Sequence, residues 1–250
     1  MMMTMTMMVR KAILDGDILA YRAAFWADVE GEEYLEGRLK DDLKRWTPPD
    51  VDEIEIALSC KRSDNFRRDW LPDYKAHRDG KPSPESLPLA LEILPMLAPV
   101  VRQDRMEADD LMGIEKSALR AICVTIDKDL KQVPGYGWYP QIDPEIAITE
   151  VFYTELADAD FQFHKQWIMG DSTDNVGGIW KLGEKKAEAL LRATSPRNHT
   201  ALVLSLYETR KNKEGGSYSL DDAIAMGRAV RICRDGELAL YDWYSSAWEE

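Results

Sequence analysis

The chain has 250 residues, enough for one large domain or for one domain with a small appendage. Its hydrophobic content of 45% indicates a globular protein with a substantial core, and its net charge of −13 excludes a protein coated in basic surface. Three widely spaced cysteines and three histidines form no disulfide framework and no zinc pattern, so disulfide chemistry and zinc chemistry are not expected.

The chain begins with a methionine-rich stretch, residues 1–8, which lacks the basic region of a signal peptide and is expected to be disordered. No later stretch is long and apolar enough to cross a membrane, so we expect a cytoplasmic protein. Residues 9–14 predict a buried strand, which ends at Asp15, and residues 18–26 predict a helix that carries Arg22. Because ligands gather at the carboxyl ends of strands in open α/β sheets, Asp15 is a candidate site residue.

A helix over residues 34–46 and a strand over residues 54–58 lead to a basic segment, residues 61–81. This segment holds seven Lys and Arg residues against four Asp, with aromatic residues every four positions, among them Tyr74. Such an interleaving suits a nucleic-acid strand, with cations on phosphates and rings under bases. The same spacing also fits an aromatic stripe packed into the core. Residues 82–99 predict an irregular helical excursion.

Two further short strands each lead into acids. Residues 99–102 precede Glu107-Ala108-Asp109-Asp110, in which Glu107 and Asp110 would share a helical face. Residues 121–126 precede Asp127-Lys128-Asp129, whose two carboxylates would face one side of an extended segment. Acids at a helix start can simply favour the helix dipole. Three strands that each end in acids, however, favour a shared site.

A last pair of acids, Asp171 and Asp174, lies three residues apart behind a glycine, a spacing that would point both carboxylates the same way. A bend with Gly177, Gly178 and Gly183 follows and opens into the helix start Glu184-Lys185-Lys186. Backbone amides at such a start can hold a phosphate. The alternative is an Asx turn before a solvated helix.

Carboxylates without His or Cys suit hard divalent cations, Mg²⁺ or Mn²⁺. Two such ions, roughly 3.5–4 Å apart, can activate water and stabilise the leaving oxygen of a phosphoryl displacement. Lys75 and Arg78 are the candidates to offset charge on the phosphate. A nuclease is therefore favoured. Two alternatives stay open: a haloacid-dehalogenase-type phosphatase with Asp15 as nucleophile and Asp17 as acid/base, and an inert DNA-binding domain.

The chain resembles the 5′-nucleases of the flap endonuclease and polymerase-associated exonuclease superfamily, and within it the small stand-alone phage 5′→3′ exonucleases. The similar blocks keep their order from about residue 9 to residue 191. They are Leu14-Asp15-Gly16 with Tyr21-Arg22-Ala23, Asn65-Phe66-Arg67 with Tyr74-Lys75-Ala76-His77-Arg78, Glu107-Ala108-Asp109-Asp110, Thr125-Ile126-Asp127-Lys128-Asp129, and Gly170-Asp171-Ser172-Thr173-Asp174-Asn175 with Gly183-Glu184-Lys185-Lys186-Ala187.

The resemblance implies an α/β, PIN-like fold with a mostly parallel central sheet flanked by helices. Residues 9–165 would form the catalytic domain, with a basic helical arch over about residues 61–98, and residues 166–250 a helix-hairpin-helix and C-terminal helical region. The implied activity is that of a divalent-metal-dependent 5′→3′ exonuclease or flap endonuclease. Its implied substrates are DNA with 5′ ends or flaps and RNA primers in RNA–DNA hybrids, and its implied partners are replisome proteins. Its expected cofactors are two Mg²⁺ or Mn²⁺ ions and K⁺ at the hairpin.

The resemblance also assigns residues to roles. The implied catalytic residues are Asp15, Lys75, Arg78 and Asp110. The implied metal ligands are Asp15, Glu107, Asp109, Asp110, Asp127, Asp129, Asp171 and Asp174. The implied DNA contacts are Arg22, Arg67, Tyr74, Lys75, Arg78, Gly178, Gly183, Lys185 and Lys186.

Three departures from the family pattern bear on these roles. The aspartate expected after the second strand is replaced by Cys60-Lys61-Arg62, with Asp64 as an uncertain substitute. His77 stands where the family has Asn, and Trp180-Lys181 replaces Pro-Gly in the hairpin. The first departure puts one metal ligand in question, and the last puts the potassium site in question.

Overall fold

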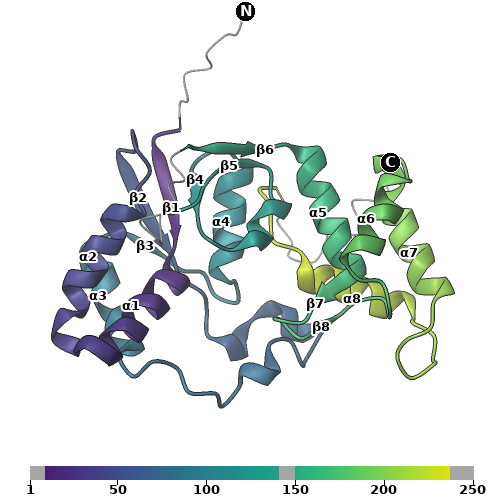
Figure 1. The fold of residues 1–250 in the computed structure, drawn as a ribbon, viewed down its shortest axis with the longest axis horizontal. Helices are drawn as coiled ribbons and strands as arrows, with labels where there is room; N and C mark the ends of the chain where they lie inside the picture. The colour runs from purple at the N-terminus through teal and green to yellow at the C-terminus, as the bar shows by residue number, and fades with distance from the viewer. Residues whose placement is uncertain (1–8, 141–149, 237–250) are drawn as a thin grey trace, which may run out of the picture.

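The computed structural model describes residues 9–140 and 150–236, so the disorder expected for residues 1–8 lies outside the described part of the chain. Within that part, a six-stranded sheet in the order β3-β2-β1-β4-β5-β6 forms the centre of one half of the molecule (Figure 1). Neighbouring strands are parallel, except that β6 pairs antiparallel with β5. The strands are β1 (Lys11–Asp15), β2 (Glu53–Ala57), β3 (Val100–Val101), β4 (Ile122–Val124), β5 (Gly135–Trp138) and β6 (Phe152–Thr154).

The first strand, β1, is buried on both faces, as its apolar sequence predicts. Ala12 and Leu14 point into a hydrophobic cluster on one face of the sheet, and Ile13 points into a cluster on the other, because successive side chains of a strand alternate. The strand lies between β2 and β4. Asp15, at its carboxyl end, therefore lies at the middle of the sheet edge where ligands gather in open α/β folds.

Helices cover both faces of this sheet. On one face lie α1 (Gly16–Glu30), α2 (Leu35–Arg45) and α3 (Leu87–Leu97), and on the other α4 (Ala108–Ser117). Helix α3 spans part of the stretch where we expected an irregular excursion. Pro88 falls in its first turn, where a proline removes no hydrogen bond, and Pro95 lies inside the helix near its end. Among the described helices, none has the length and apolar character that a membrane span requires.

A second hydrophobic cluster, which we call the helical cluster, lies beside the sheet and is built mainly from C-terminal helices. These are α5 (Leu156–Met169), α6 (Glu184–Arg192), α7 (His199–Thr209) and α8 (Leu220–Val230). Between α5 and α6 lie the hairpin of β7 (Gly170–Asp171) and β8 (Val176–Gly177) and then a turn over residues 178–183. The predicted helix-hairpin-helix falls on this turn and the start of α6, not on the β7–β8 hairpin. The expected domain boundary, between residues 165 and 166, falls inside α5, whose Phe163 and Trp167 both belong to the helical cluster.

The basic segment after β2 joins the sheet to the helical cluster. Where we expected a helical arch, it contains three short 3-10 turns, η2 (Arg62–Asp64), η3 (Phe66–Asp69) and η4 (Ala76–Arg78). Lys75 has a left-handed backbone with φ of 54°, which interrupts helical geometry at this point. In Figure 1 the segment runs along the lower edge of the molecule, and Tyr74 within it is buried in the helical cluster.

Candidate active site

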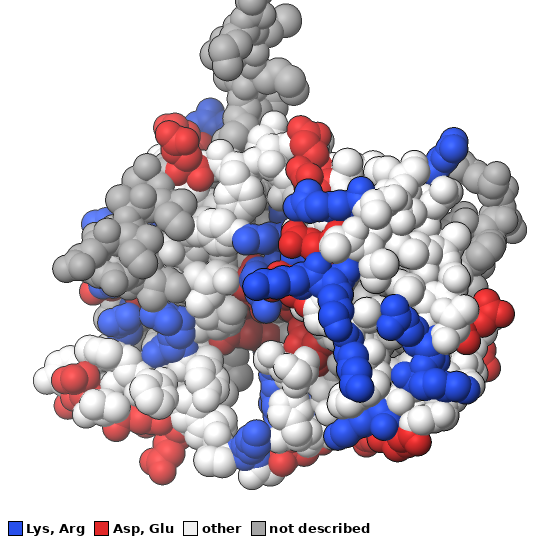
Figure 2. Space-filling view, turned by 45° about the vertical axis from the view of Figure 1, so that its right-hand side comes forward, with Lys and Arg blue, Asp and Glu red and all other residues white. Residues whose placement is uncertain are grey.

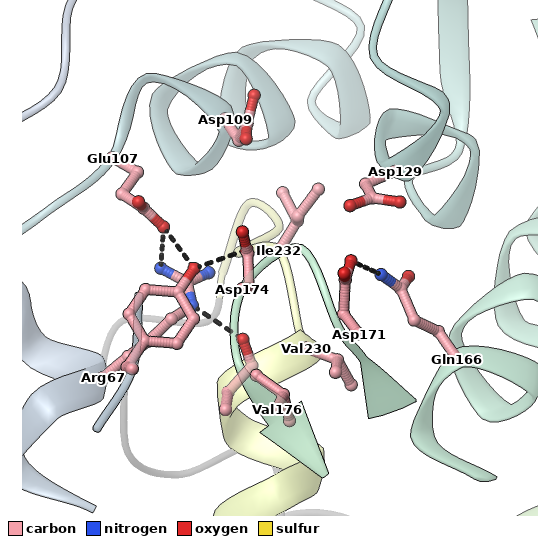
Figure 3. A pocket seen from close by; sticks show the side chains of 12 residues that line it. Arg67, Glu107, Asp109, Asp129, Gln166, Asp171, Asp174, Val176, Val230 and Ile232 are labelled. Carbon is pink, nitrogen blue, oxygen red and sulfur yellow. Dashed lines mark hydrogen bonds and ion pairs between the residues drawn. The ribbon is translucent and has the colours of Figure 1, made fainter. Parts of the chain in front are cut away.

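The acids predicted from the sequence gather between the carboxyl edge of the sheet and the β7–β8 hairpin. In Figure 3, Asp109 projects from the start of α4, and Asp129 and Asp171 approach the same pocket from the other side. The pocket encloses about 20 Å³ of space, room for roughly one water molecule or one ion. The pocket therefore brings together carboxylates that come from three separate stretches of sequence.

Several of these carboxylates resist ionisation. Burial raises the pKa of Asp15 to about 7, and the neighbouring charge of Asp17 adds to the shift. Burial also raises the pKa of Asp129 to about 7, with Asp127 contributing repulsion. The pKa of Asp109 lies well above its ordinary value because of burial and then of the nearby Asp15. A cation among these groups would remove their mutual repulsion and favour their ionised forms.

Two of the acids are fixed by local hydrogen bonds. Asp15 Oδ1 accepts a hydrogen bond from the backbone of Ile18 at 3.0 Å, which caps α1, and Oδ2 accepts one from the Thr125 hydroxyl at 2.7 Å. Asp127 caps a 3-10 turn by accepting a hydrogen bond from the backbone of Asp129 at 2.8 Å. The prediction that Asp127 and Asp129 alternate along an extended segment is therefore wrong, because the chain turns directly after β4.

Asp171 and Asp174 both line the pocket, as predicted from their spacing, although not because they share a helical face. They lie at the two ends of a hairpin turn, where the geometry of a helix does not apply. Asp171 Oδ2 accepts a hydrogen bond from the Gln166 amide at 3.2 Å, on the side of Asp129. Asp174 instead contacts the basic segment, where its Oδ1 lies 3.1 Å from Arg78 Nη2.

Lys75 and Arg78, the predicted phosphate contacts, are held by carboxylates of the site. Lys75 Nζ lies 2.6 Å from Glu107 Oε1 and 3.4 Å from Asp174 Oδ2. Burial alone would raise the pKa of Glu107, but Lys75 and Arg67 lower it to about 2. Glu107 is thus an anion whose charge is already balanced, unlike Asp109 two residues later.

Arg67 and Tyr74 are buried, with 2% and 1% of their surface exposed. The Tyr74 hydroxyl lies 2.8 Å from Glu107 Oε2 and 2.9 Å from Asp174 Oδ2. Arg67 is enclosed by Asp110 and by backbone carbonyls. Both residues line the pocket, but their polar groups are engaged by protein partners in this conformation, so a role as DNA contacts stays a prediction. For Tyr74 the alternative of an aromatic packed into the core is the correct one.

Asp110 is also saturated by protein partners, although it was predicted to be catalytic and to bind metal. It is fully buried, and both its oxygens lie 2.7 Å from the guanidinium of Arg67. It also accepts hydrogen bonds from the backbone of Glu107 and of Cys233, each at 3.2 Å. The prediction is contradicted, because a carboxylate so engaged has no oxygen directed at the pocket. Asp109, the preceding residue, lines the pocket instead.

Sequence reasoning missed Asp17 as part of the acidic site and considered it only for a phosphatase. Asp17 accepts hydrogen bonds from the backbone of Ser59 at 3.2 Å and from its hydroxyl, directly after β2. Burial raises its pKa, and Glu107 adds repulsion. Asp64, the possible substitute for the missing aspartate, is exposed and accepts a hydrogen bond from its neighbour Ser63. The signal for Asp17 was its place two residues after Asp15 at the end of the central strand.

Two grooves extend from the acids, and basic side chains line both. One, of about 690 Å³, lies between α1, α3 and the basic segment, and the other, of about 290 Å³, lies between α5 and the turn after β4. In Figure 2, acids are visible in a hollow bordered by Lys and Arg side chains. The first groove is lined by the predicted Arg22 and by Arg62, Lys75, Arg78, Lys81 and Arg102. The second is lined by Lys128, Lys131 and Lys165. An acidic chain thus carries local positive charge where a polyanion would approach.

The predicted duplex-binding turn presents basic residues to solvent. Gly183, Lys185 and Lys186 are exposed at the start of α6. Gly178 has a different role, because a Cβ at this position would lie 2.0 Å from the backbone of Met169. This glycine allows the turn to pack against the end of α5.

Carbonyl oxygens of this turn already accept hydrogen bonds from the protein. The carbonyl of Gly178 accepts one from the Tyr218 hydroxyl at 3.3 Å, and that of Lys181 accepts one from Lys186 Nζ at 3.1 Å. The carbonyl of Ile179 accepts one from the backbone of Leu182 at 3.0 Å. A backbone carbonyl oxygen has two lone pairs, so one hydrogen bond does not prevent it from binding K⁺, and the potassium ion stays a prediction.

The acids do not form a closed metal cage in this conformation. In residues 9–140 and 150–236, no three Asp, Glu, His or Cys side chains are grouped closely enough to hold a metal ion. Lys75 and Arg78 draw Glu107 and Asp174 to themselves. The donor chemistry of the remaining carboxylates nevertheless fits a hard divalent cation.

Comparison with known proteins relates the chain to DNA polymerase I. No family model matches the chain. It is 28% identical over 206 residues to DNA polymerase I of Geobacillus stearothermophilus, a match that covers 75% of this chain and 23% of that protein. It is 29% identical over 205 residues to the thermostable DNA polymerase I of Thermus thermophilus, covering 73% of this chain and 24% of that protein. The chain matches about a quarter of the length of each of these curated relatives.

Solved structures with the same fold include two flap endonucleases. The flap endonuclease of bacteriophage T5, crystallised with DNA and metal ions, superimposes with a TM-score of 0.60 at 15% identity, covering 88% of this chain and 85% of that one. Flap endonuclease-1 from Methanococcus jannaschii gives a TM-score of 0.58 at 13% identity, covering 92% and 81%. These structures confirm the predicted α/β fold with a mostly parallel central sheet.

Proposed function

We propose that this chain is a divalent-metal-dependent 5′→3′ exonuclease and flap endonuclease that hydrolyses phosphodiester bonds of DNA. The observation that carries this proposal is the juxtaposition of carboxylates of raised pKa with Lys75 and Arg78, between two basic grooves. The similar flap endonuclease of bacteriophage T5, which was crystallised with DNA and metal ions, supports it. The polymerases that share sequence with the chain support a role in DNA replication.

The divalent cations would be held by oxygen ligands alone, which favours Mg²⁺ or Mn²⁺. When bound, such cations activate a water molecule and stabilise charge on the phosphate. The carboxylates available to hold them are Asp15, Asp109, Asp127, Asp129 and Asp171, joined by Glu107 and Asp174 once Lys75 and Arg78 leave these two. We exclude Asp110 from the set, because Arg67 already occupies both its oxygens.

The basic residues would exchange partners when DNA arrives. A scissile phosphate competes with Glu107 and Asp174 for Lys75 and Arg78, since phosphate and carboxylate bind the same donors. On the phosphate, the two cations offset the negative charge that grows as the water attacks. The released Glu107 and Asp174 then face the pocket with unbalanced charge. Substrate and divalent cation would thus each favour the binding of the other.

The proposal extends to RNA primers in RNA–DNA hybrids, because these groups act on a phosphodiester that both nucleic acids contain. For the duplex, we propose that the turn over residues 178–183 binds it, with K⁺ held by carbonyl oxygens of the turn. Lys186 supplies a cation at the carbonyl of Lys181, and Tyr218 closes the turn. An RNA-labelled strand tests the proposal on RNA primers, and a change of monovalent salt tests the proposal on the turn.

The phosphatase alternative is less compatible with the geometry. It would use only Asp15, as nucleophile, and Asp17, as acid/base. That alternative also assigns no role to Asp109 and Asp129, which line the pocket. An inert binding domain would gain nothing from several carboxylates whose ionisation the fold opposes.

A labelled flap duplex tests the proposal. A duplex with a single-stranded 5′ flap, labelled separately at each 5′ end, is incubated with Mg²⁺, Mn²⁺ or EDTA. We expect metal-dependent release of short 5′ products by the wild type and at least a 100-fold slower rate for Asp109→Asn, since loss of one charged group in such sites costs about 10²-fold or more. Asp41→Asn, an exposed acid on α2, is the matched control and is expected to cleave as the wild type does.

Three results would overturn the proposal. One is cleavage in EDTA, which would exclude a divalent cation. Another is equal cleavage by Asp109→Asn and wild type, which would place the chemistry elsewhere. The third is no cleavage in Mg²⁺ or Mn²⁺ together with turnover of a small phosphoester, which would favour the phosphatase.

A further inference from the structure

A pair of glutamine side chains connects the acidic pocket to the C-terminal segment that follows α8. Gln166, on α5, donates a hydrogen bond from Nε2 to Asp171 Oδ2 at 3.2 Å, and its side chain also contacts Asp129. Its Oε1 accepts a hydrogen bond from Gln132 Nε2 at 3.0 Å. Gln166 is half-buried at the pocket, whereas Gln132 is 1% exposed behind it. The amides thus form a chain that leads from the protein interior to two carboxylates of the site.

The orientation of Gln132 is fixed by the backbone of the C-terminal segment. Its Oε1 accepts a hydrogen bond from the backbone N–H of Ile232 at 3.1 Å, and its Nε2 donates one to the carbonyl of Val230 at 2.8 Å. A backbone N–H can only donate and a carbonyl can only accept, so the Gln132 amide cannot flip. Its remaining N–H must then point at Gln166.

This constraint passes on to Gln166. Because Gln166 Oε1 receives the N–H of Gln132, its own amino group must face Asp171 and Asp129. Two neighbouring carboxylates repel one another, and each would otherwise rotate away from the pocket. A neutral donor that is held from behind restrains them without adding a charge that would compete with a cation.

We infer that Gln166, held in place by Gln132, is a positioning residue that orients Asp171 and Asp129 toward the divalent cation of the pocket. This inference rests on the proposed function and deepens it. Groups behind metal ligands commonly change metal affinity by 10- to 100-fold when they are removed. The C-terminal segment becomes part of the site by the same argument, since its backbone sets the direction of both amides.

Substitutions of similar shape separate the donor from the space that it fills. Gln166→Met keeps the length of the side chain and removes the amide, whereas Gln166→Glu keeps the shape and replaces the donor with a third carboxylate. Gln103→Met is the matched control, because Gln103 is exposed in the loop after β3 and lines neither the pocket nor either groove. All three are compared with the wild type as full-length chains.

The measurements are Mn²⁺ affinity by calorimetry, the thermal midpoint with and without Mn²⁺, and cleavage of the flap substrate over a range of Mn²⁺ concentrations. For Gln166→Met we expect a metal-free midpoint within about 4 °C of the wild type, which corresponds to roughly 1 kcal/mol for a chain of this size. We expect Mn²⁺ affinity to fall about 10- to 100-fold, with cleavage restored at high Mn²⁺. Gln166→Glu should change Mn²⁺ affinity in the same experiments, and Gln103→Met should match the wild type.

Each other result decides against a specific idea. If the wild type binds Mn²⁺ and cleaves, but both Gln166 variants keep its affinity and its Mn²⁺ dependence, the positioning role is refuted and the nuclease proposal stands. A metal-free midpoint lowered by far more than 4 °C in both variants would make Gln166 a structural residue and would also refute the role. If the wild type itself neither binds Mn²⁺ nor cleaves, the nuclease proposal fails, and the inference fails with it.

Discussion

Two adjacent acids, Asp109 and Asp110, are expected to respond oppositely to substitution. Asp110→Ala removes a fully buried carboxylate that lies 2.7 Å from two nitrogens of Arg67, whose guanidinium is itself buried. It also removes the acceptor of two backbone N–H groups, those of Glu107 and Cys233. The variant therefore leaves a buried cation without its main partner.

The cost follows from that unpaired charge. Breaking a buried ion pair by removing one partner costs about 3–5 kcal/mol, a large part of the roughly 5–15 kcal/mol that stabilises a typical domain. The substitution Asp109→Asn should not lower the free energy of unfolding. Because the pKa of Asp109 is raised, its ionised form destabilises the metal-free fold at pH 8. Its neutral amide should leave the free energy of unfolding unchanged or slightly higher.

Urea unfolding of the metal-free protein at pH 8 measures both effects, with EDTA present and the m-value checked for constancy. A third variant, Arg67→Met with Asp110→Leu, removes both charges together. It should cost less than the sum of the two single substitutions, since neither partner is left buried alone. A flap-cleavage assay on the same samples should show that Asp109→Asn is inactive although it is folded.

The reasoning is refuted if Asp110→Ala and Asp109→Asn change the free energy of unfolding by similar amounts. It is equally refuted if Asp110→Ala costs less than about 1 kcal/mol, the scale of an exposed ion pair. Either result would mean that Asp110 is not held as the structure has it.

Three further predictions concern catalysis and pH. Lys75→Met should slow flap cleavage by about 10²–10³-fold while the protein stays folded, as judged by circular dichroism; an unchanged rate would remove Lys75 from the reaction. The raised pKa values of Asp15 and Asp129, both about 7, contribute stability below pH 4 that is lost as pH rises through about 7. Mg²⁺ should therefore raise the thermal midpoint more at pH 8 than at pH 5.5, and an equal shift would contradict this. Burial lowers the pKa of His164 to about 4, so its contribution is present above pH 6.5 and is lost as pH falls toward 4. His164→Gln should flatten that part of the urea stability profile relative to the wild type.

The sequence alone determined the sheet and the general place of the site. Apolar runs such as residues 9–14 predict strands that are buried on both faces, and β1 lies at the middle of a mostly parallel sheet. Acids that directly follow such strands meet at one sheet edge, because parallel strands share a direction. Asp15, Asp109 and Asp129 could therefore be found from local pattern. Helix α3 could not, since its prolines suggested a break.

Only the tertiary structure decided which charged residues are free to act. Asp109 and Asp110 are the same residue type side by side, yet Arg67, 43 positions earlier, neutralises one of them. Tyr74 likewise lies in a basic segment whose sequence suggests exposure, but helices that come later in the chain bury it. Local patterns record which groups can ionise. Which of them keep an unbalanced charge depends on partners that are distant in sequence, since charge balance and burial are set by neighbours in space.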